Sequence, residues 1–163
     1  MKIRRVLIGT VLGVSAFLLS VAPAAAQSGV QFAAGYQYLK FLEDGGDSVP
    51  GGWGASISGG KTAVKFVADF GGHYEDGGSL HTYQGGVEFA GKNEKVTPFV
   101  RGLVGGGTFS DGRGTAFIFT PEFGVRFMGP SGVGMQVAAG FPIMNKDDDT
   151  QTTFRLFVGV VIK

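Results

Sequence analysis

The stretch from Thr115 to Met128, which reads TAFIFTPEFGVRFM, decides how this sequence folds. Bulky apolar residues recur in it at every second position, and successive side chains of a β-strand point to opposite faces. One face therefore carries Phe117, Phe119, Phe123, Val125 and Phe127. The other face carries Glu122 and Arg126. This pattern predicts a strand whose bulky face is free of charge and whose charged face lies opposite.

The same alternation recurs along the chain after residue 26. The alternating segments are short, and clusters of Gly, Asp, Asn and Ser separate them, which is typical of strands and hairpins. A helical fold is disfavoured because the chain has 30 Gly, each costing about 1 kcal/mol in a helix interior. We predict eight strands, at about residues 30–40, 52–58, 62–72, 80–90, 96–106, 115–128, 133–144 and 152–163.

Charged side chains avoid the bulky face within most of these strands. Lys40 shares that face in the first strand, but it stands at the strand end, where a long side chain can reach an interface. The strand at 96–106 is ambiguous, because Phe99 and Leu103 share the parity of Arg101. An arginine that faces lipid near the middle of a membrane costs about 2–4 kcal/mol. We therefore predict that Arg101 points inward, with Val100 and Val104 outward.

The size of the bulky face indicates which face lies inside. The interior of an eight-stranded barrel is only just wide enough for side chains to fill it. The bulky face would overfill it with Trp53, Phe66, Phe70, Tyr83, Phe89, Phe117, Phe119, Phe123, Phe127, Phe141 and Phe154. The opposite parity offers smaller residues, namely Ala33, Gly35, Gly54, Ser56, Ser58, Gly86, Ala138 and Gly140. The sequence thus predicts an all-β fold, an eight-stranded antiparallel up-and-down transmembrane β-barrel with its bulky face toward lipid.

The first residues predict export. Lys2, Arg4 and Arg5 precede an apolar run from Val6 to Val21, and small residues follow at 24–26. This is the pattern of a secretory signal peptide, and the run is shorter than the roughly 20 residues that a membrane-spanning helix needs. We expect a signal peptide at 1–26 and a barrel domain at 27–163.

Composition excludes several classes of function. The chain has 14 Lys and Arg against 13 Asp and Glu, and cleavage after residue 26 would leave 11 against 13. No basic patch indicates a nucleic-acid partner. The chain has no cysteine, which rules out disulfides, thiol catalysis and thiolate metal sites. We expect no cofactor.

Several stretches resemble the outer-membrane β-barrel proteins of the opacity-protein-like type. They are Gly35-Tyr36-Gln37-Tyr38-Leu39, Pro50-Gly51-Gly52-Trp53, Leu80-His81-Thr82-Tyr83-Gln84-Gly85-Gly86, Thr97-Pro98-Phe99-Val100-Arg101-Gly102-Leu103-Val104-Gly105 and Phe154-Arg155-Leu156-Phe157-Val158-Gly159-Val160-Val161. The resemblance implies outer-membrane lipids and the barrel-assembly machinery as partners. Members of this family commonly end on an aromatic residue, whereas this chain ends on Ile162 and Lys163.

The inward parity carries the candidate site. Its charged residues are Lys65, Asp69, Glu88, Arg101, Glu122, Arg126 and Arg155, with Gln31, Gln37, Gln84 and Gln136 between them. Charges enclosed by a barrel must pair, because an unpaired buried charge costs several kcal/mol. We predict a polar network of ion pairs that fills the lumen, in place of a wide porin-like pore.

Two other groups of residues suggest chemistry on residue type alone. His73, Glu75, Ser79 and His81 contain the residue types of a hydrolase, but alternation puts His81 on the lipid side. Asp147, Asp148 and Asp149, with Asp44 and Asp47, lack the alternating ligand spacing of a calcium loop. We expect no catalytic residues and no metal site.

The predicted strand order places four acidic loops at one end of the barrel. The longest connections follow the first, third, fifth and seventh strands, as expected of extracellular loops. The same end carries an expected aromatic girdle of Tyr36, Tyr38, Trp53, Phe70, Tyr83, Phe117, Phe141 and Phe154. The function expected is an outer-membrane protein with a structural or adhesive role and a surface-loop partner that the sequence does not name. The alternative is a secreted soluble barrel that binds a small apolar ligand.

Overall fold

The computed structural model describes residues 29–42, 48–60, 63–75, 77–93, 95–110, 114–146 and 149–163. The predicted signal peptide lies outside these residues. The described chain forms nine strands, namely β1 (Val30–Phe41), β2 (Ser48–Gly59), β3 (Val64–Glu75), β4 (Gly78–Ala90), β5 (Val96–Phe109), β6 (Gly114–Met128), β7 (Val133–Gly140), β8 (Ile143–Lys146) and β9 (Asp149–Ile162). No helix of this part of the chain has the length and apolarity to cross a membrane.

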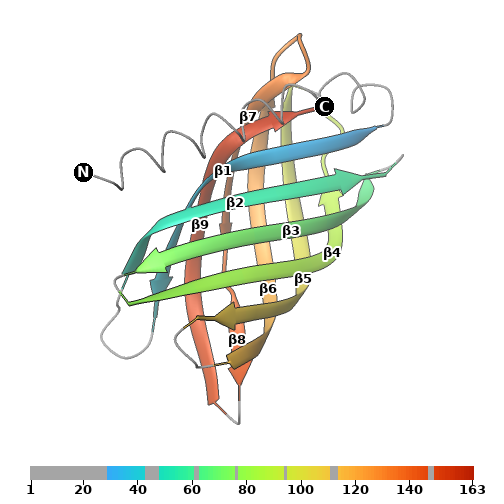
Figure 1. The fold of residues 1–163 in the computed structure, drawn as a ribbon. Coiled ribbons are helices and arrows are strands. Elements are labelled where there is room, and N and C mark those ends of the chain that lie inside the picture. The colour runs from blue at the N-terminus through green and yellow to red at the C-terminus, as the bar shows by residue number, and fades with distance from the viewer. Residues whose placement is uncertain are drawn as a thin grey trace, which may run out of the picture.

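The strands close into one antiparallel barrel (Figure 1). From β1 to β7 each strand pairs with its neighbour in sequence, and β9 pairs with β7 and β8 on one side and with β1 on the other. The ladder between β1 and β9 runs from the pair Phe32 and Ile162 to the pair Phe41 and Thr153. The predicted all-β, eight-stranded, up-and-down barrel is therefore confirmed, because β7 and β8 together occupy one of its eight positions.

The predicted strand at 133–144 is interrupted in the structure by Phe141 and Pro142. Proline has no backbone N–H to give to a ladder. Backbone groups at the interruption still find partners on the neighbouring strands. The Phe141 N–H donates to the Pro121 carbonyl at 3.0 Å, and the Thr153 N–H donates to the Pro142 carbonyl at 2.9 Å. Both β7 and β8 pair with β6 and β9, so the barrel stays closed through the break.

The expected difference in connection length between the two ends is wrong for the hairpin of β3 and β4. Residues 73–75 and 78–79, expected in a loop, continue the ladder as far as the pair Glu75 and Gly78. Similarly, β5 extends to Phe109 and β9 begins at Asp149. Turn-forming residues at these places bend the chain only at the hairpin tip, and the backbone on either side still pairs.

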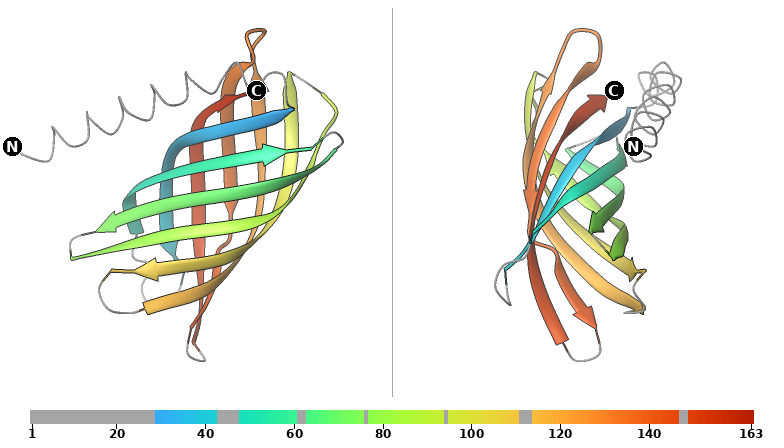
Figure 2. Two further views of the ribbon diagram at one scale, coloured as in Figure 1. Left: turned by 45° about the vertical axis from the view of Figure 1, so that its right-hand side comes forward. Right: turned by 60° about the vertical axis from the view of Figure 1, so that its left-hand side comes forward.

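The barrel is strongly staggered. The register leads from Tyr36 through β2, β3, β4 and β5 to Thr115 of β6, whereas the opposite path through β9 and β7 leads to Val125. These two positions on β6 are ten residues apart, and such a shear requires the strands to tilt against the barrel axis. Figure 2 shows the tilt in two further views.

The two faces of the sheet carry the side chains that the parity predicts. Bulky apolar side chains are exposed on the outside, with Phe66 at 76% and Phe117 at 58%. Tyr36, Trp53, Phe70, Tyr83 and Phe141 of the expected girdle are likewise exposed, and Tyr38 and Phe154 are half-buried. Ile162 departs from the pattern, because it shares the outward parity yet is buried between its register neighbours Phe32 and Val133.

Strand β5 settles the ambiguous case as predicted. Val100 and Val104 are 53% and 50% exposed, while Phe99, Arg101 and Leu103 are buried. The bulkier pair therefore lies inside because it shares a face with a charge that needs partners.

This facing predicts the response of β5 to a new charge on its outer face. In Val100→Arg the guanidinium enters the hydrocarbon, so the free energy of unfolding should fall by about 2–4 kcal/mol. Val96→Arg is the matched control, because Val96 lies on the same outer face at the end of the strand, where the cost falls to about 0–1 kcal/mol. The measurement is denaturant unfolding of both variants in lipid vesicles. A Val100→Arg variant as stable as the parent protein would contradict this facing.

Candidate functional site

The interior of the barrel is layered. An apolar cluster toward the loop end contains Leu39, Val49, Leu80, Ala116, Ile118 and Met144. A second one, toward the turns, contains Ala33, Phe99, Ala138, Phe157 and Val161. Charged and polar side chains occupy the interior between and beside these clusters. Apolar side chains thus flank much of the polar interior, while Lys65 is partly exposed.

Four charges of alternating sign lie along one row of the sheet. Lys65 of β3 is in register with Glu88 of β4, Glu88 with Arg101 of β5, and Arg101 with Glu122 of β6. Side chains directly opposite each other on neighbouring strands are within reach, and opposite charges in such pairs stabilise the sheet. The register alone therefore places each of these charges next to a counter-ion.

Glu88 is the centre of this row. Its carboxylate accepts from Arg101 Nε at 2.8 Å and from Arg126 Nη1 at 2.7 Å, and Arg126 Nη2 makes a second contact. Lys65 Nζ lies 3.8 Å from the same carboxylate. Glu88 and Arg126 are 0% and 1% exposed, and a pair of bonds from one guanidinium fixes geometry as well as charge.

Glu122 extends the network across the lumen. It accepts from Arg101 Nη1 at 3.1 Å and from Arg155 Nη2 at 2.5 Å. Arg155 Nη1 also donates to Asp69 at 3.0 Å, which joins β9 to β3 through the interior. The structure therefore brings together all seven charged residues that the sequence singled out, in one continuous set of ion pairs.

Neutral groups extend the network. Lys65 donates to Gln31 at 2.8 Å, Arg126 Nε donates to Gln136 at 2.8 Å, and the Gln84 side chain is hydrogen-bonded to Thr120 at 2.9 Å. Phe99 was not anticipated as part of this site. Its ring lies 4.6 Å from the Arg101 guanidinium carbon and 4.2 Å from that of Arg126, which is cation–π geometry. Its shared parity with Arg101 was the signal for this role.

The two histidines of the hypothetical hydrolase group lie on opposite faces of the sheet. His73 is buried in the interior, whereas His81 is exposed on the outer face, so the sheet separates the two imidazoles. Ser79 Oγ does lie 3.3 Å from His81 Nε2. The side chain of Glu75 lies outside the part that the structure describes. Within that part, no three His, Cys, Asp or Glu side chains are grouped to hold a metal ion. Asp44, Asp47, Asp147 and Asp148 are outside it.

Among the solved structures of similar fold are several small outer-membrane barrels. Neisserial surface protein A matches with a TM-score of 0.67 at 16% identity, over 83% of this chain and 97% of that protein. Ail, the attachment invasion locus protein of Yersinia pestis, has a TM-score of 0.51 at 17% identity, over 83% and 99%. OprG of Pseudomonas aeruginosa has a TM-score of 0.54 at 11% identity, over 83% and 95%.

These likenesses confirm the fold that the resemblance to opacity-type barrels implied. No known protein-family model matches the sequence, and no curated protein matches it either. The chain therefore has the architecture of small outer-membrane barrels with a sequence far from these examples.

The network predicts that Glu88 cannot be neutralised without a large loss of stability. Glu88→Gln leaves Arg101 and Arg126 without their shared counter-ion, and breaking a buried ion pair costs about 3–5 kcal/mol. Removing one arginine as well, in Glu88→Gln with Arg126→Gln, should restore part of this loss. The measurement is the free energy of unfolding in vesicles.

Asp149→Asn provides the control for that experiment, because Asp149 is an exposed carboxylate at the loop end. Surface substitutions of this kind change stability by about 0.5 kcal/mol or less. A Glu88→Gln variant as stable as Asp149→Asn would show that the network does not hold the barrel together.

Proposed function

We propose that this protein is an integral outer-membrane protein whose barrel anchors four surface loops for a structural or adhesive role, without enzymatic activity. The observation that carries the proposal is that large apolar side chains lie outside and charged side chains lie inside, the reverse of a water-soluble protein. Large apolar side chains are exposed around the barrel, six charged side chains are buried within it, and Lys65 is half-buried. A lipid environment is the solvent in which that distribution is stable.

The alternative, a soluble barrel that binds an apolar ligand, is less well supported. A soluble protein rarely exposes a contiguous apolar patch of more than a few hundred square ångströms. Here exposed aromatic or branched side chains occur on the outer faces of β2, β3, β4, β5 and β6. The interior in which such a ligand would bind is occupied instead by paired charges.

The filled lumen also argues against a wide pore. Arg155 spans the interior to Asp69, and Arg101 and Arg126 converge on Glu88. An eight-stranded barrel leaves little room beyond its own side chains. The role of the network is therefore to hold the strands together.

Adhesion is favoured by the composition of the loop end. Its residues include Glu43, Asp44, Asp47, Glu75, Asp76, Asp111 and Asp147 to Asp149. Such an acidic rim suits a basic partner surface, and its attraction acts over about 10 Å at 0.1 M salt. Ail, one of the structurally similar proteins, is named the attachment invasion locus protein.

Tags placed in the connections should reveal which end faces the outside. Epitopes inserted within residues 43–47 and at residues 147–148 should bind antibody on intact cells, whereas one inserted in Gly129–Gly132 should require permeabilised cells. Extracellular loops of such barrels are longer, whereas their periplasmic turns are short. The opposite labelling would invert the orientation, and tagged protein in the soluble fraction would favour the ligand binder.

Conductance provides the second test. Purified protein in a planar bilayer should give no stable large current steps, because the ion pairs fill the lumen. A wide open channel in the same bilayers, used as a positive control, would verify detection. Steady porin-like steps from this protein would contradict a filled interior.

A further inference from the structure

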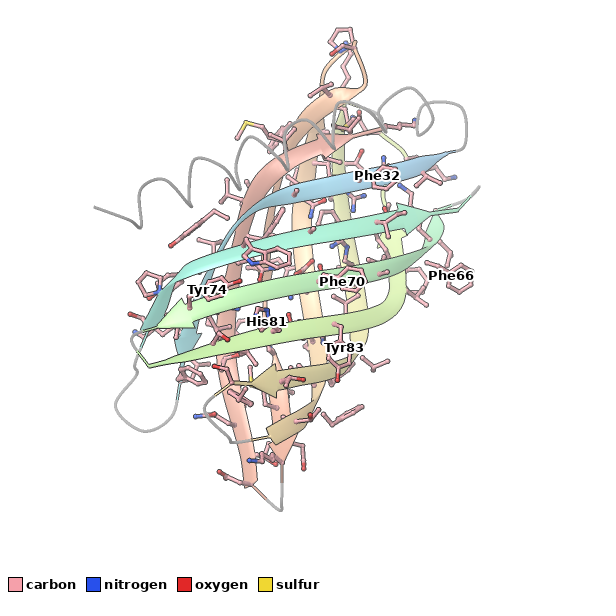
Figure 3. The ribbon with its side chains drawn as sticks, viewed as in Figure 1. Phe32, Phe66, Phe70, Tyr74, His81 and Tyr83 are labelled. Carbon is pink, nitrogen blue, oxygen red and sulfur yellow. The ribbon has the colours of Figure 1, made fainter. Side chains whose placement is uncertain are left out.

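The outer face of β2, β3 and β4 changes its chemistry along the strands. Toward the turns it carries apolar side chains, among them Ile57, Phe66, Val87 and Phe89. Toward the loops it carries side chains with an N–H or O–H group. Four of these contact one another, Trp53, Tyr74, Ser79 and His81, and we name them the Trp53–His81 strip. Figure 3 shows Tyr74 and His81 close together near the loop end of β3 and β4, with Phe66 at the far end of β3.

The side chains of the strip contact one another across three strands. The Trp53 indole N–H donates to the Tyr74 hydroxyl at 3.2 Å. The rings of Tyr74 and His81 meet edge to face with centroids 5.7 Å apart, and Ser79 Oγ lies 3.3 Å from His81 Nε2. The strip is thus a preorganised polar surface on the outside of the barrel, and not a set of separate side chains.

Gly72 lets the indole lie flat. It stands in register between Trp53 of β2 and His81 of β4. A Cβ at Gly72 would lie 2.4 Å from Trp53 Nε1, so the indole covers this glycine and turns its other face outward. Trp53 is 42% exposed, and Tyr74 is 52% exposed. A flat aromatic face therefore lies beside two hydroxyls and an imidazole.

We propose that the Trp53–His81 strip binds the headgroup of a phosphorylated glycolipid of the outer leaflet. This inference rests on the proposed function, in which the loop end of the barrel faces outward. Hydroxyl and imidazole groups that face acyl chains lose their hydrogen bonds to water, which costs several kcal/mol in the least polar surroundings. A lipid headgroup at the same depth returns those bonds, and aromatic side chains with one polar end favour that interface.

The geometry divides the recognition among the side chains. The Tyr74 oxygen accepts from Trp53, so its own O–H is available to donate to a phosphate. His81 contacts Ser79 through Nε2, and in the tautomer in which Nε2 accepts from the Ser79 hydroxyl the Nδ1–H is a donor toward the ligand. The exposed indole face of Trp53 suits the apolar face of a sugar ring. Phosphate and sugar together are the chemistry that distinguishes this ligand from a simple phospholipid.

The chain has 1 Trp, so tryptophan fluorescence reports on Trp53 and therefore on the strip itself. The experiment follows its fluorescence while the purified full-length barrel in neutral detergent is titrated with a bis-phosphorylated acylated glucosamine disaccharide. The same glycolipid without phosphates and phosphatidylglycerol serve as comparison lipids. The phosphorylated glycolipid should give a saturable change, with an affinity at least tenfold above both others, or about 1.4 kcal/mol. Equal affinity for all three lipids would overturn the proposal.

Two substitutions test the assigned groups and leave the reporter in place. Tyr74→Phe and His81→Leu should each weaken binding about tenfold, since each removes one hydrogen bond to a charged group. Tyr83→Phe is the matched control, because Tyr83 is an exposed tyrosine on the outer face of β4 outside the strip, and it should bind as the parent does. Parental affinity in both strip variants would overturn the proposal.

The absence of glycolipid binding at the strip can be told apart from a failure of the proposed function. Binding is measured on purified protein, whereas the location of the loops is read from the tags on cells. Mass spectrometry of the glycolipid after incubation adds a separate result. Release of a fatty acid would overturn the non-enzymatic role through Ser79 and His81 and would leave binding at the strip supported.

Discussion

The ladder between β1 and β9 is the contact on which the rest of the structure depends. Within a lipid bilayer every backbone N–H and C=O must find a partner in the protein, and a sheet achieves this only when its two edges pair. The ladder closes over ten residue pairs between Phe32 and Phe41 of β1. Closure fixes the number of strands, and with the ten-residue stagger it fixes the width of the interior.

The width of the interior determines which side chains it can hold. The lumen accepts the small residues of β1 and β2, the charged residues of β3 to β6 and β9, and the rings of Phe99 and Phe157, while most of the described aromatic residues remain outside. The seven charges are held in the interior at a desolvation cost that their pairing offsets. The same closure that seals the backbone therefore also forces the charges into one another's reach.

The outer surface is divided by depth. Around the turn-side half it is apolar, and at the loop end of β2 to β4 it carries the polar tips of Trp53, Tyr74 and His81. The interior network offers little surface for recognition, because its charged groups pair with one another and only Lys65 among them is partly exposed. Any contact with lipids or with other molecules is therefore made by the outer wall and the loops.

The sequence by itself determined the class of fold, the facing of the strands and the members of the network. Two-residue alternation is a local property, and the cost of a lipid-facing arginine was enough to orient β5 around Arg101. The tertiary structure alone decided which charges meet, because partners such as Arg155 and Asp69 are 86 residues apart and are joined only by closure. It also decided the break at Pro142 and the extension of β3 to Glu75, since pairing of the backbone depends on the neighbouring strand and not on local residue type.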